Sequence, residues 1–402
     1  MKKLKIFNDP VYGFISVPDG LIMELIEHTV FQRLRRIKQL GLSDFIYPGA
    51  THSRFHHALG AFHLMTEALD SLRLKGVSIS VEEYEASQIA ILLHDIGHGP
   101  FSHVLEHSLL PVAHEEITIL LMEWLNVEFK GRLSLALRIF KNQYSRSFFH
   151  DLISSQLDVD RLDYLTRDSF FTGVAEGVIG YDRLIKMMDV HEDHIVLEEK
   201  GLYSIEKFLV ARRIMYWQVY MHKTAIAAEK MLHSIFELVQ ADLNKYIKNS
   251  PLIYLIDNEY HNKVDIHSPD FIDRFLAIDD SDIWQVLKQL SKSDHKLLRY
   301  LSKGILERRF LKIYLRNEPF SSDFVDNMRL TCANIFDVSA IEAKVLIQEG
   351  SLDLTVYSHF EKEINIKSRH NHSIPLSEVL DLHSFLKSNT KYYCTVPKDL
   401  YS

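Results

Sequence analysis

Cysteine is almost absent from this chain of 402 residues, which contains only Cys332 and Cys394. The two lie far apart and show no metal-type spacing, so we expect no disulfide framework and a reducing, cytoplasmic compartment. Long apolar runs are lacking as well, and no apolar stretch follows the charged start, which predicts a soluble, unprocessed protein without a membrane partner. Positive charge is not in excess: the net charge of −8 does not indicate a nucleic-acid partner.

Low-complexity tracts and internal repeats are also lacking. A hydrophobic content of 47% and a charged content of 25% indicate an ordinary globular protein with one large core and a smaller appended domain. Strand-like runs flank a turn within residues 4–18, and helical spacing of apolar residues dominates from there to about residue 247.

After residue 251 the pattern changes, because helical spacing at 268–303 gives way to alternation at 309–315 and to two strand-like runs within 341–366. We therefore predict a mainly α protein. Residues 1–250 would form an all-helical core with a small N-terminal β-hairpin, and residues 251–402 an accessory α+β region.

Histidine, in contrast, is concentrated in one stretch. Residues 91–103 are an apolar helical run that ends on the pair His94-Asp95, is broken by glycine and proline, and continues with further histidines. Such a pair is unusual in a core helix because buried polar side chains must find partners. The sequence therefore indicates that these two residues have a chemical role.

Two other segments offer ligands of the same kind. They contain His57 and Asp160. The His94-Asp95 pair and the Asp-Val-Asp run at 158–160 both fall between apolar positions that should be buried. Buried carboxylates need a cation, and a divalent ion that binds two imidazoles and two carboxylates supplies one. We predict a catalytic metal site made of His57, His94, Asp95 and Asp160, with positions left for water and substrate.

This arrangement resembles the HD-domain phosphohydrolases, whose signature is H…HD…D. It is most similar to the deoxynucleoside-triphosphate triphosphohydrolase branch, which contains the SAM-and-HD-domain protein of vertebrates. Residues 7–10, 31–35, 37–41, 94–103 and 158–160 match that branch almost letter for letter. The resemblance covers about residues 5–235 and implies the fold of the helical core. The later region shows no motif beyond the accessory region that family members often carry.

The resemblance also implies roles for further residues at matching positions. His103 corresponds to the acid that protonates the leaving oxygen and Glu106 to the group that orients it, whereas His98 and His114 would contact phosphate or line the site. The implied substrate-binding residues are Gln39, Leu40, Arg54, Arg161, Tyr164, Asp168 and Arg212. A nucleotide-effector site would include Lys5, Asn8, Gln32 and Arg35. Because effector sites of this family lie between subunits, the resemblance implies a homo-oligomer, either dimer or tetramer.

Some positions depart from the family pattern. Met221 stands where the family usually has a glutamine beside the sugar, and Tyr216 replaces a histidine. Glu27 stands for an aspartate, and a basic pair expected at 191–194 is missing. We therefore expect activation by a guanine nucleotide to be weakened or altered.

Together these residues predict a metal-dependent hydrolase that releases deoxynucleoside and triphosphate from a deoxynucleoside triphosphate (dNTP). The cofactor would be a divalent ion, with Mn, Fe, Zn, Ni and Mg all accepted to different degrees by such ligands. The alternatives are an HD hydrolase of a monophosphate, cyclic nucleotide or alarmone, and a non-catalytic nucleotide sensor. A zinc peptidase motif also fits residues 103–107, but it leaves the four metal-site residues unexplained.

Overall fold

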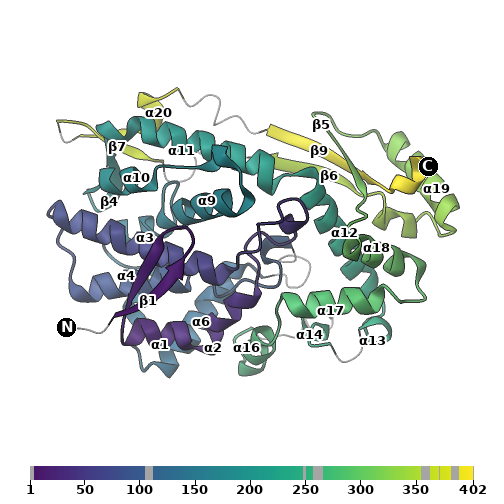
Figure 1. Ribbon diagram of the computed structural model, residues 1–402, viewed down its shortest axis with the longest axis horizontal. Helices are drawn as coiled ribbons and strands as arrows, with labels where there is room; N and C mark the ends of the chain where they lie inside the picture. The colour runs from purple at the N-terminus through teal and green to yellow at the C-terminus, as the bar shows by residue number, and fades with distance from the viewer. Residues whose placement is uncertain are drawn as a thin grey trace.

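The computed structural model of this protein describes residues 4–104, 112–247, 250–256, 266–354, 363–370, 372–381 and 389–401. Helices form most of it, with three small sheets at the periphery (Figure 1). The helices up to residue 240 are α1 (Leu21–Glu27), α2 (Thr29–Arg33), α3 (Arg54–Leu74), α4 (Val81–Leu93), α6 (His114–Glu128), α7 (Ser134–Phe140), α8 (Phe148–Asp151), α9 (Val159–Thr172), α10 (Tyr181–Met187), α11 (Leu202–Met215) and α12 (Lys223–Gln240).

The remaining helices are mostly shorter. They are α13 (Leu243–Tyr246), α14 (Ile253–Ile256), α16 (Pro269–Leu276), α17 (Asp280–Leu290), α18 (Lys296–Leu306), α19 (Ser322–Phe336) and α20 (Leu376–Val379). None of the helices in the described part of the chain is both long and apolar enough to cross a membrane.

The sheets consist of short strands. The N-terminal hairpin pairs β1 (Leu4–Asp9) with β2 (Gly13–Pro18) in antiparallel register. A second sheet has the order β3 (Met188–His191), β4 (His194–Glu198), β7 (Asn365–Lys367) and β8 (Ser373–Pro375). The third has the order β5 (Lys312–Arg316), β9 (Asn389–Val396) and β6 (Glu349–Leu354). The predicted mainly α class, with its hairpin and its α+β region, is thus confirmed.

Helix α3 lies at the centre of the core and packs against both α4 and α9. Its apolar residues are buried on nearly every side, as expected for a helix that is surrounded by other helices. At Gly60 a Cβ atom would collide with the side chains of Asp163 and Arg167 on α9, so only glycine allows the two helices to approach this closely.

Helix boundaries near the predicted site are set by side-chain caps. Ser80 and Glu83 form a reciprocal capping box at the start of α4, with N–H···O distances of 3.1 and 2.8 Å. Asp158 accepts a hydrogen bond of 2.7 Å from the Arg161 N–H and so begins α9, which ends at Gly173 in the left-handed conformation. These caps fix where His94 and Asp160 lie.

The helical pattern predicted up to about residue 247 is interrupted at several places in the structure. The segment 146–170 contains two helices, because the cap at Asp158 separates α8 from α9. Between 203 and 247 a π-helical turn at Tyr216–Tyr220 separates α11 from α12, and the His222 side chain caps α12. After α2 the chain forms a 3-10 turn at Leu34–Arg36. Strands β3 and β4 lie within residues 1–250, where only helices were predicted beyond the hairpin.

Candidate metal centre and active-site cavity

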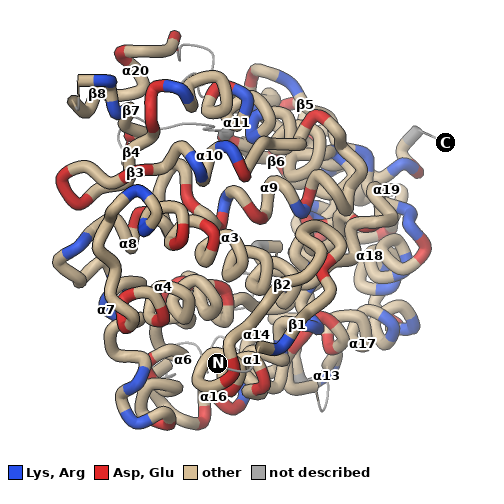
Figure 2. Tube along the Cα trace, turned by 60° about the vertical axis from the view of Figure 1, so that its left-hand side comes forward, with Lys and Arg blue, Asp and Glu red and all other residues tan. Residues whose placement is uncertain are grey.

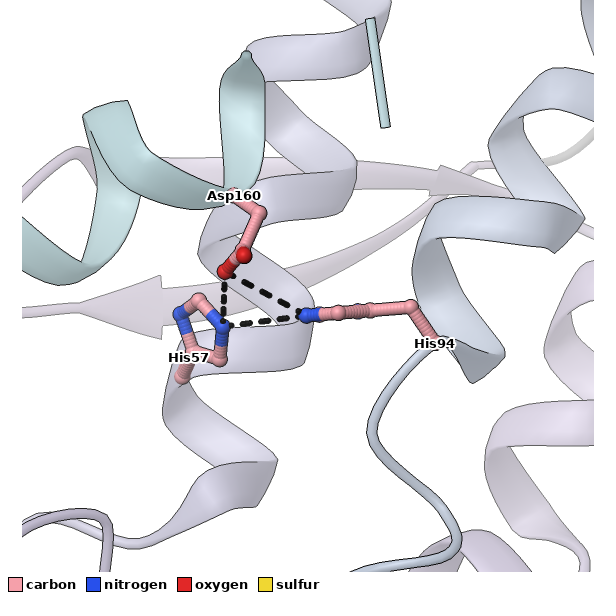
Figure 3. A group of neighbouring side chains, drawn as sticks. All are labelled: His57, His94 and Asp160. Atoms are coloured by element: carbon pink, nitrogen blue, oxygen red, sulfur yellow. Dashed lines mark hydrogen bonds and ion pairs between the residues drawn. The ribbon is translucent and has the colours of Figure 1, made fainter. Parts of the chain in front are cut away.

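The predicted metal residues of three helices meet at one point (Figure 3). His57 lies on the first turn of α3, His94 follows the last residue of α4, and Asp160 is the second residue of α9. The Nε2 atoms of the two histidines are 3.2 Å apart, and Asp160 Oδ1 lies 3.0 Å from the first and 3.4 Å from the second. Asp95 Oδ2 lies 3.5 Å from His57 Nε2, so the structure brings all four residues together.

The other ring nitrogen of each histidine faces a hydrogen-bond acceptor. His57 Nδ1 lies 2.7 Å from Asp163 Oδ2, and His94 Nδ1 lies 2.6 Å from the Ile91 carbonyl oxygen. These acceptors favour a proton on Nδ1 and leave the Nε2 lone pair directed at the centre of the cluster. This donor set fits a divalent cation, since two imidazole nitrogens and two carboxylates converge with their outer hydrogen bonds in place.

The electrostatics of the cluster agree with this fit. Burial lowers the pKa of His57, but hydrogen bonds to Asp160 and Asp163 raise it to about 10. For Asp160 burial acts in the opposite direction and raises the pKa of the carboxyl group. The contacts of Asp160 with His57 and His94 outweigh this effect and hold that pKa well below the usual range. The carboxylates around the histidines therefore favour positive charge at this point.

A chain of buried ion pairs connects His57 to the N-terminal hairpin. Arg167 is fully buried and donates from Nε to Asp163 Oδ2 at 3.0 Å and from Nη1 to Asp9 Oδ2 at 2.8 Å. Asp9 also accepts hydrogen bonds of 2.9 Å from the N–H groups of Val11 and Tyr12 in the hairpin turn. The hairpin thus fixes Asp163, and through it the orientation of the His57 ring.

Two further predicted histidines lie on the other side of Asp95. His98 Nε2 is 3.3 Å from Asp95 Oδ1, and the rings of His98 and His114 are stacked with centroids 3.8 Å apart. One ligand atom from each of these three residues falls within 4.8 Å of the others, which makes them a second group able to hold a cation. Both histidines line the cavity described next.

A cavity of about 560 Å³ opens from the metal cluster, a volume typical of small-molecule sites. The predicted substrate residues found on its wall are Gln39, Leu40, Arg54, Arg161, Tyr164 and Asp168. Arg212 is not among the lining residues: it is buried, and its Nη1 donates to Gln156 Oε1 at 3.1 Å. Tyr216, whose ring centroid lies 6.0 Å from the Arg212 guanidinium carbon, does line the cavity. The contact of Arg212 with substrate stays a prediction.

The two arginines on the wall are held by neighbours. Arg54 donates from Nη1 to Asp95 and from Nε to Ser102 Oγ at 2.7 Å. It therefore connects the metal cluster to the turn at Ser102, in the loop that follows α4. Arg161 donates from Nε to the Ser155 carbonyl at 2.6 Å and lies 3.2 Å from Asp158. Fixed guanidinium groups of this kind suit the binding of phosphate oxygens.

Asp168 is held by two residues that the sequence analysis did not identify. His52 Nε2 lies 2.8 Å from Oδ1, and the Tyr220 hydroxyl donates to Oδ2 at 2.7 Å. Tyr220 also lines the cavity, so a phenol ring and a fixed carboxylate lie side by side on its wall. Nothing local in the sequence marks Tyr220, since only the fold places it beside α9.

The predicted catalytic acid, His103, lies at the edge of the described part of the chain. The backbone of His103 belongs to a 3-10 turn at Ser102–Val104, but its side chain and the whole of Glu106 lie outside the described residues. The turn itself is strained, because Phe101 and Ser102 have φ angles of 54° and 57°. Asp280 at the start of α17 stabilises this turn by accepting hydrogen bonds of 2.7 Å from Phe101 N–H and 2.8 Å from Lys38 N–H.

The predicted effector residues lie near the surface at the end of α1. Lys5 forms an ion pair of 2.9 Å with Glu27, and Arg35 Nε donates to Gln32 Oε1 at 2.8 Å. Asn8 pairs with Phe14 across the hairpin. The structure thus groups Lys5, Gln32 and Arg35 around one helix end, and their role as an effector site stays a prediction.

The far wall of the cavity comes from segments that the sequence did not connect with function. Its lining residues from α12 and β6 are Ile226, Glu229, Lys230 and Leu352. Burial raises the pKa of Glu229 to about 7, while Lys230 has a smaller lowering effect. The apolar spacing of α12 could reveal that one face is buried, but not that this face borders a cavity.

Comparison with known proteins agrees with this geometry. The family model of the HD domain matches residues 54–168, and that of the HD associated region matches residues 179–271. A solved phosphohydrolase from Bacteroides thetaiotaomicron is 44% identical, with a TM-score of 0.92, and the match covers 98% of this chain and 100% of that one. The chain therefore belongs to the HD-domain phosphohydrolase superfamily, whose domains bind divalent metals.

Within the superfamily the chain lies near the SAMHD1 branch. A SAMHD1 homolog of Dictyostelium discoideum, named as a deoxynucleoside triphosphate triphosphohydrolase, is 32% identical over 258 residues, which are 58% of this chain and 49% of that protein. The uncharacterized protein YwfO of Bacillus subtilis is 39% identical over 238 residues, which are 58% of this chain and 55% of that protein. The chain thus matches about half the length of these two relatives.

Proposed function

We propose that this protein is a metal-dependent phosphohydrolase that converts dNTPs into deoxynucleoside and inorganic triphosphate. The observation that carries the proposal is the convergence of His57, His94, Asp95 and Asp160 at one end of a cavity that also contains Arg54 and Arg161. Phosphoryl transfer depends on positioned cations around the phosphate oxygens, and this wall provides them. The name of the Dictyostelium relative supports the choice of substrate.

Each group near the cluster has a distinct part in the proposed reaction. A divalent cation held by the four residues would polarise the phosphate and lower the pKa of a water molecule, so that hydroxide is available to attack the phosphorus. Arg54 and Arg161 bind phosphate oxygens, and His98 and His114 lie beside the reacting phosphate. By family resemblance, His103 protonates the leaving oxygen and Glu106 orients that histidine.

The sugar would bind between Asp168, Tyr164 and Gln39. Gln39 Oε1 is buried and accepts no hydrogen bond from the described residues, so it is available to a sugar hydroxyl. This compensates for Met221, which cannot form a hydrogen bond of that kind. By the same resemblance, we propose a cytoplasmic homo-oligomer with a nucleotide effector at Lys5, Asn8, Gln32 and Arg35.

A turnover screen tests the proposal. Purified protein is incubated with dNTPs, NTPs, nucleoside monophosphates, cyclic nucleotides and an alarmone, each with Mn, Mg, Fe, Zn or Ni, and products are separated by chromatography. The control is the His94→Ala/Asp95→Ala variant. We expect triphosphate release from dNTPs by the unaltered protein and none by the variant.

Other outcomes would contradict the proposal in distinct ways. Release of single phosphates, or turnover of another nucleotide class only, would assign this protein to a different HD reaction. Nucleotide binding without turnover in the presence of each metal would indicate a non-catalytic nucleotide sensor.

A further inference from the structure

Glu229 is an acidic side chain on the wall of the active-site cavity that the proposed reaction does not use. It lies on α12 and lines the same cavity as Arg54 and Asp160. No hydrogen bond or ion pair joins this carboxylate to any described residue, and the ammonium group of Lys230 lies over the ring of Tyr393, 5.0 Å from its centroid. A half-buried carboxylate without a partner is costly unless a ligand completes its hydrogen bonds.

The position of Glu229 shows which end of the cavity it serves. The metal cluster is built from α3, α4 and α9, whereas α12 lies well apart from α3 and α4, beside α18 (Figure 1). Arg54 and Arg161 both stand next to the cluster, at Asp95 and Asp160. The α12 end carries Glu229 and the oppositely charged Lys230, whereas the cluster end carries both arginines and the predicted cation site. A triphosphate is therefore attracted to the cluster, which leaves the α12 end of the cavity to the nucleoside.

The surroundings of Glu229 suit a flat, partly apolar group. Ile226, one turn before Glu229 on α12, is apolar, as are the lining residues Leu40, Met221 and Leu352. A nucleobase fits such walls with its faces, and its polar edge then needs a fixed partner. Among the lining residues from α12 and β6, Glu229 offers a carboxylate for that edge.

We propose, on the basis of the function proposed above, that Glu229 forms hydrogen bonds with the base of the nucleotide and selects guanine. Two donors from a bound ligand favour the ionised form of this carboxylate over its neutral form. In the ionised form it only accepts hydrogen bonds, and its two oxygens can accept two parallel ones. Guanine presents two adjacent donors, the N1–H and the N2 amino group, on one edge. Adenine and cytosine present one amino group beside an acceptor nitrogen, and thymine presents one N–H between two carbonyl oxygens, so each brings an acceptor against the carboxylate.

The test measures the ranking of the four bases in two ways. The first is kcat/KM for dGTP, dATP, dCTP and dTTP with Mn²⁺ or the metal found most active. The second is the dissociation constant of the four α,β-imido dNTP analogues, determined by calorimetry with the same metal. We expect dGTP and its analogue to be preferred by about 10-fold or more, since hydrogen bonds to a charged group are the stronger ones.

The variant Glu229→Gln changes the pattern of donors and acceptors with almost no change in shape. Its amide has one acceptor and one donor, which matches the edges of adenine and cytosine. We expect kcat/KM for dGTP to fall by about 10- to 100-fold, and the preference to move to dATP or dCTP. The matched control is Glu237→Gln, an exposed residue two turns further along α12, which should keep the original ranking.

The two readouts separate this inference from the proposed function. Turnover of all four dNTPs without a guanine preference, or an equal loss for all four in Glu229→Gln, would overturn the role of Glu229 and leave the function standing. A guanine preference in binding that Glu229→Gln removes, without any turnover, would support the role of Glu229 and overturn the hydrolase. Absence of both binding and turnover would overturn both.

Discussion

His57 illustrates how a single residue joins the metal cluster to the rest of the protein. Its Nε2 faces His94 and Asp160, while its Nδ1 is fixed by Asp163. Asp163 is itself fixed by Arg167, which has no exposed surface. The ring orientation therefore depends on residues that never contact the cluster.

We expect the substitution Asp163→Asn to weaken metal binding by about 10- to 100-fold, as is usual for groups that orient a ligand histidine. The amide oxygen can still accept from His57, but the negative charge that favours the Nδ1 proton is lost. The measurement is the metal content per chain after dialysis, together with activity as a function of metal concentration. Asp182→Asn, at an exposed position of α10, should change neither quantity. An unaltered metal content in Asp163→Asn would contradict this role.

At the residue scale, the sequence predicted the candidate metal ligands, because these residues lie in short, recognisable motifs. His94 and Asp95 are adjacent in an apolar run, and Asp160 lies in a run with similar surroundings, so burial and chemistry together indicated a cation. The structure brings these residues and His57 together, and their role as metal ligands stays a prediction. Glu229 was missed because an isolated glutamate on a helix is typical of a solvated surface, and only the packing of α12 places it in a cavity.

Among the elements, the strained turn at the predicted catalytic acid His103 depends on a distant helix. Asp280 at the start of α17 holds Phe101 and Lys38 through their backbone N–H groups. Ser102 in the same turn accepts from Arg54 and donates to the Lys38 carbonyl oxygen at 2.7 Å. Helix α17 thus stabilises the loop from outside the N-terminal 250 residues.

For this reason we expect Asp280→Ala to lower kcat by about 10-fold or more while the metal content stays the same. Removal of the carboxylate leaves two buried N–H groups unpaired, and a small displacement of a reacting group has a large effect on rate. Steady-state kinetics and metal analysis of the purified variant would measure both quantities. Asp294→Ala, at an exposed position between α17 and α18, is the control. Unchanged kcat in Asp280→Ala would show that the turn holds without it.

Element types were predictable from periodicity, but element ends were less so. The interruption before Asp158 depends on a side-chain cap within an otherwise helical pattern, and the π-helical turn at 216–220 has no pattern of its own. Strands β3 and β4 are short, and β4 gains its second partner from β7, more than 160 residues later. Contacts at such separation cannot be inferred from local spacing. The role of Asp280 was missed for the same reason, since it looked like an ordinary residue at a helix start.

The whole molecule shares one hydrophobic core. Buried residues from the hairpin to β9 form a single connected cluster, and α12 packs against both α18 and β5. Acidic and basic residues are interspersed along the described elements (Figure 2), in keeping with the modest net charge. The predicted division at residue 250 stays a prediction, but residues on both sides of it line the same cavity.

Because helices from distant parts of this core meet at the metal cluster, metal removal should affect the stability of the entire protein. We expect a chelator to lower the melting temperature by about 2–5 °C and added Mn²⁺ to restore it, since a ligand that binds only the native state stabilises it. Calorimetry with and without EDTA would measure this shift. The His94→Ala/Asp95→Ala variant should show the lower melting temperature in both conditions. An equal response of that variant would mean that the chelator acts elsewhere.

The order of these residues along the chain has a consequence for biosynthesis. During translation His57, His94 and Asp95 leave the ribosome first, and Asp160, Asp163 and Arg167 follow soon afterwards. Leu352, which lines the same cavity, is made nearly 200 residues later. The predicted metal ligands are therefore all synthesised well before the cavity wall is complete. We expect a nascent chain to be able to load its cofactor before it can select a substrate, with the synthesis of the second half of the protein between the two events.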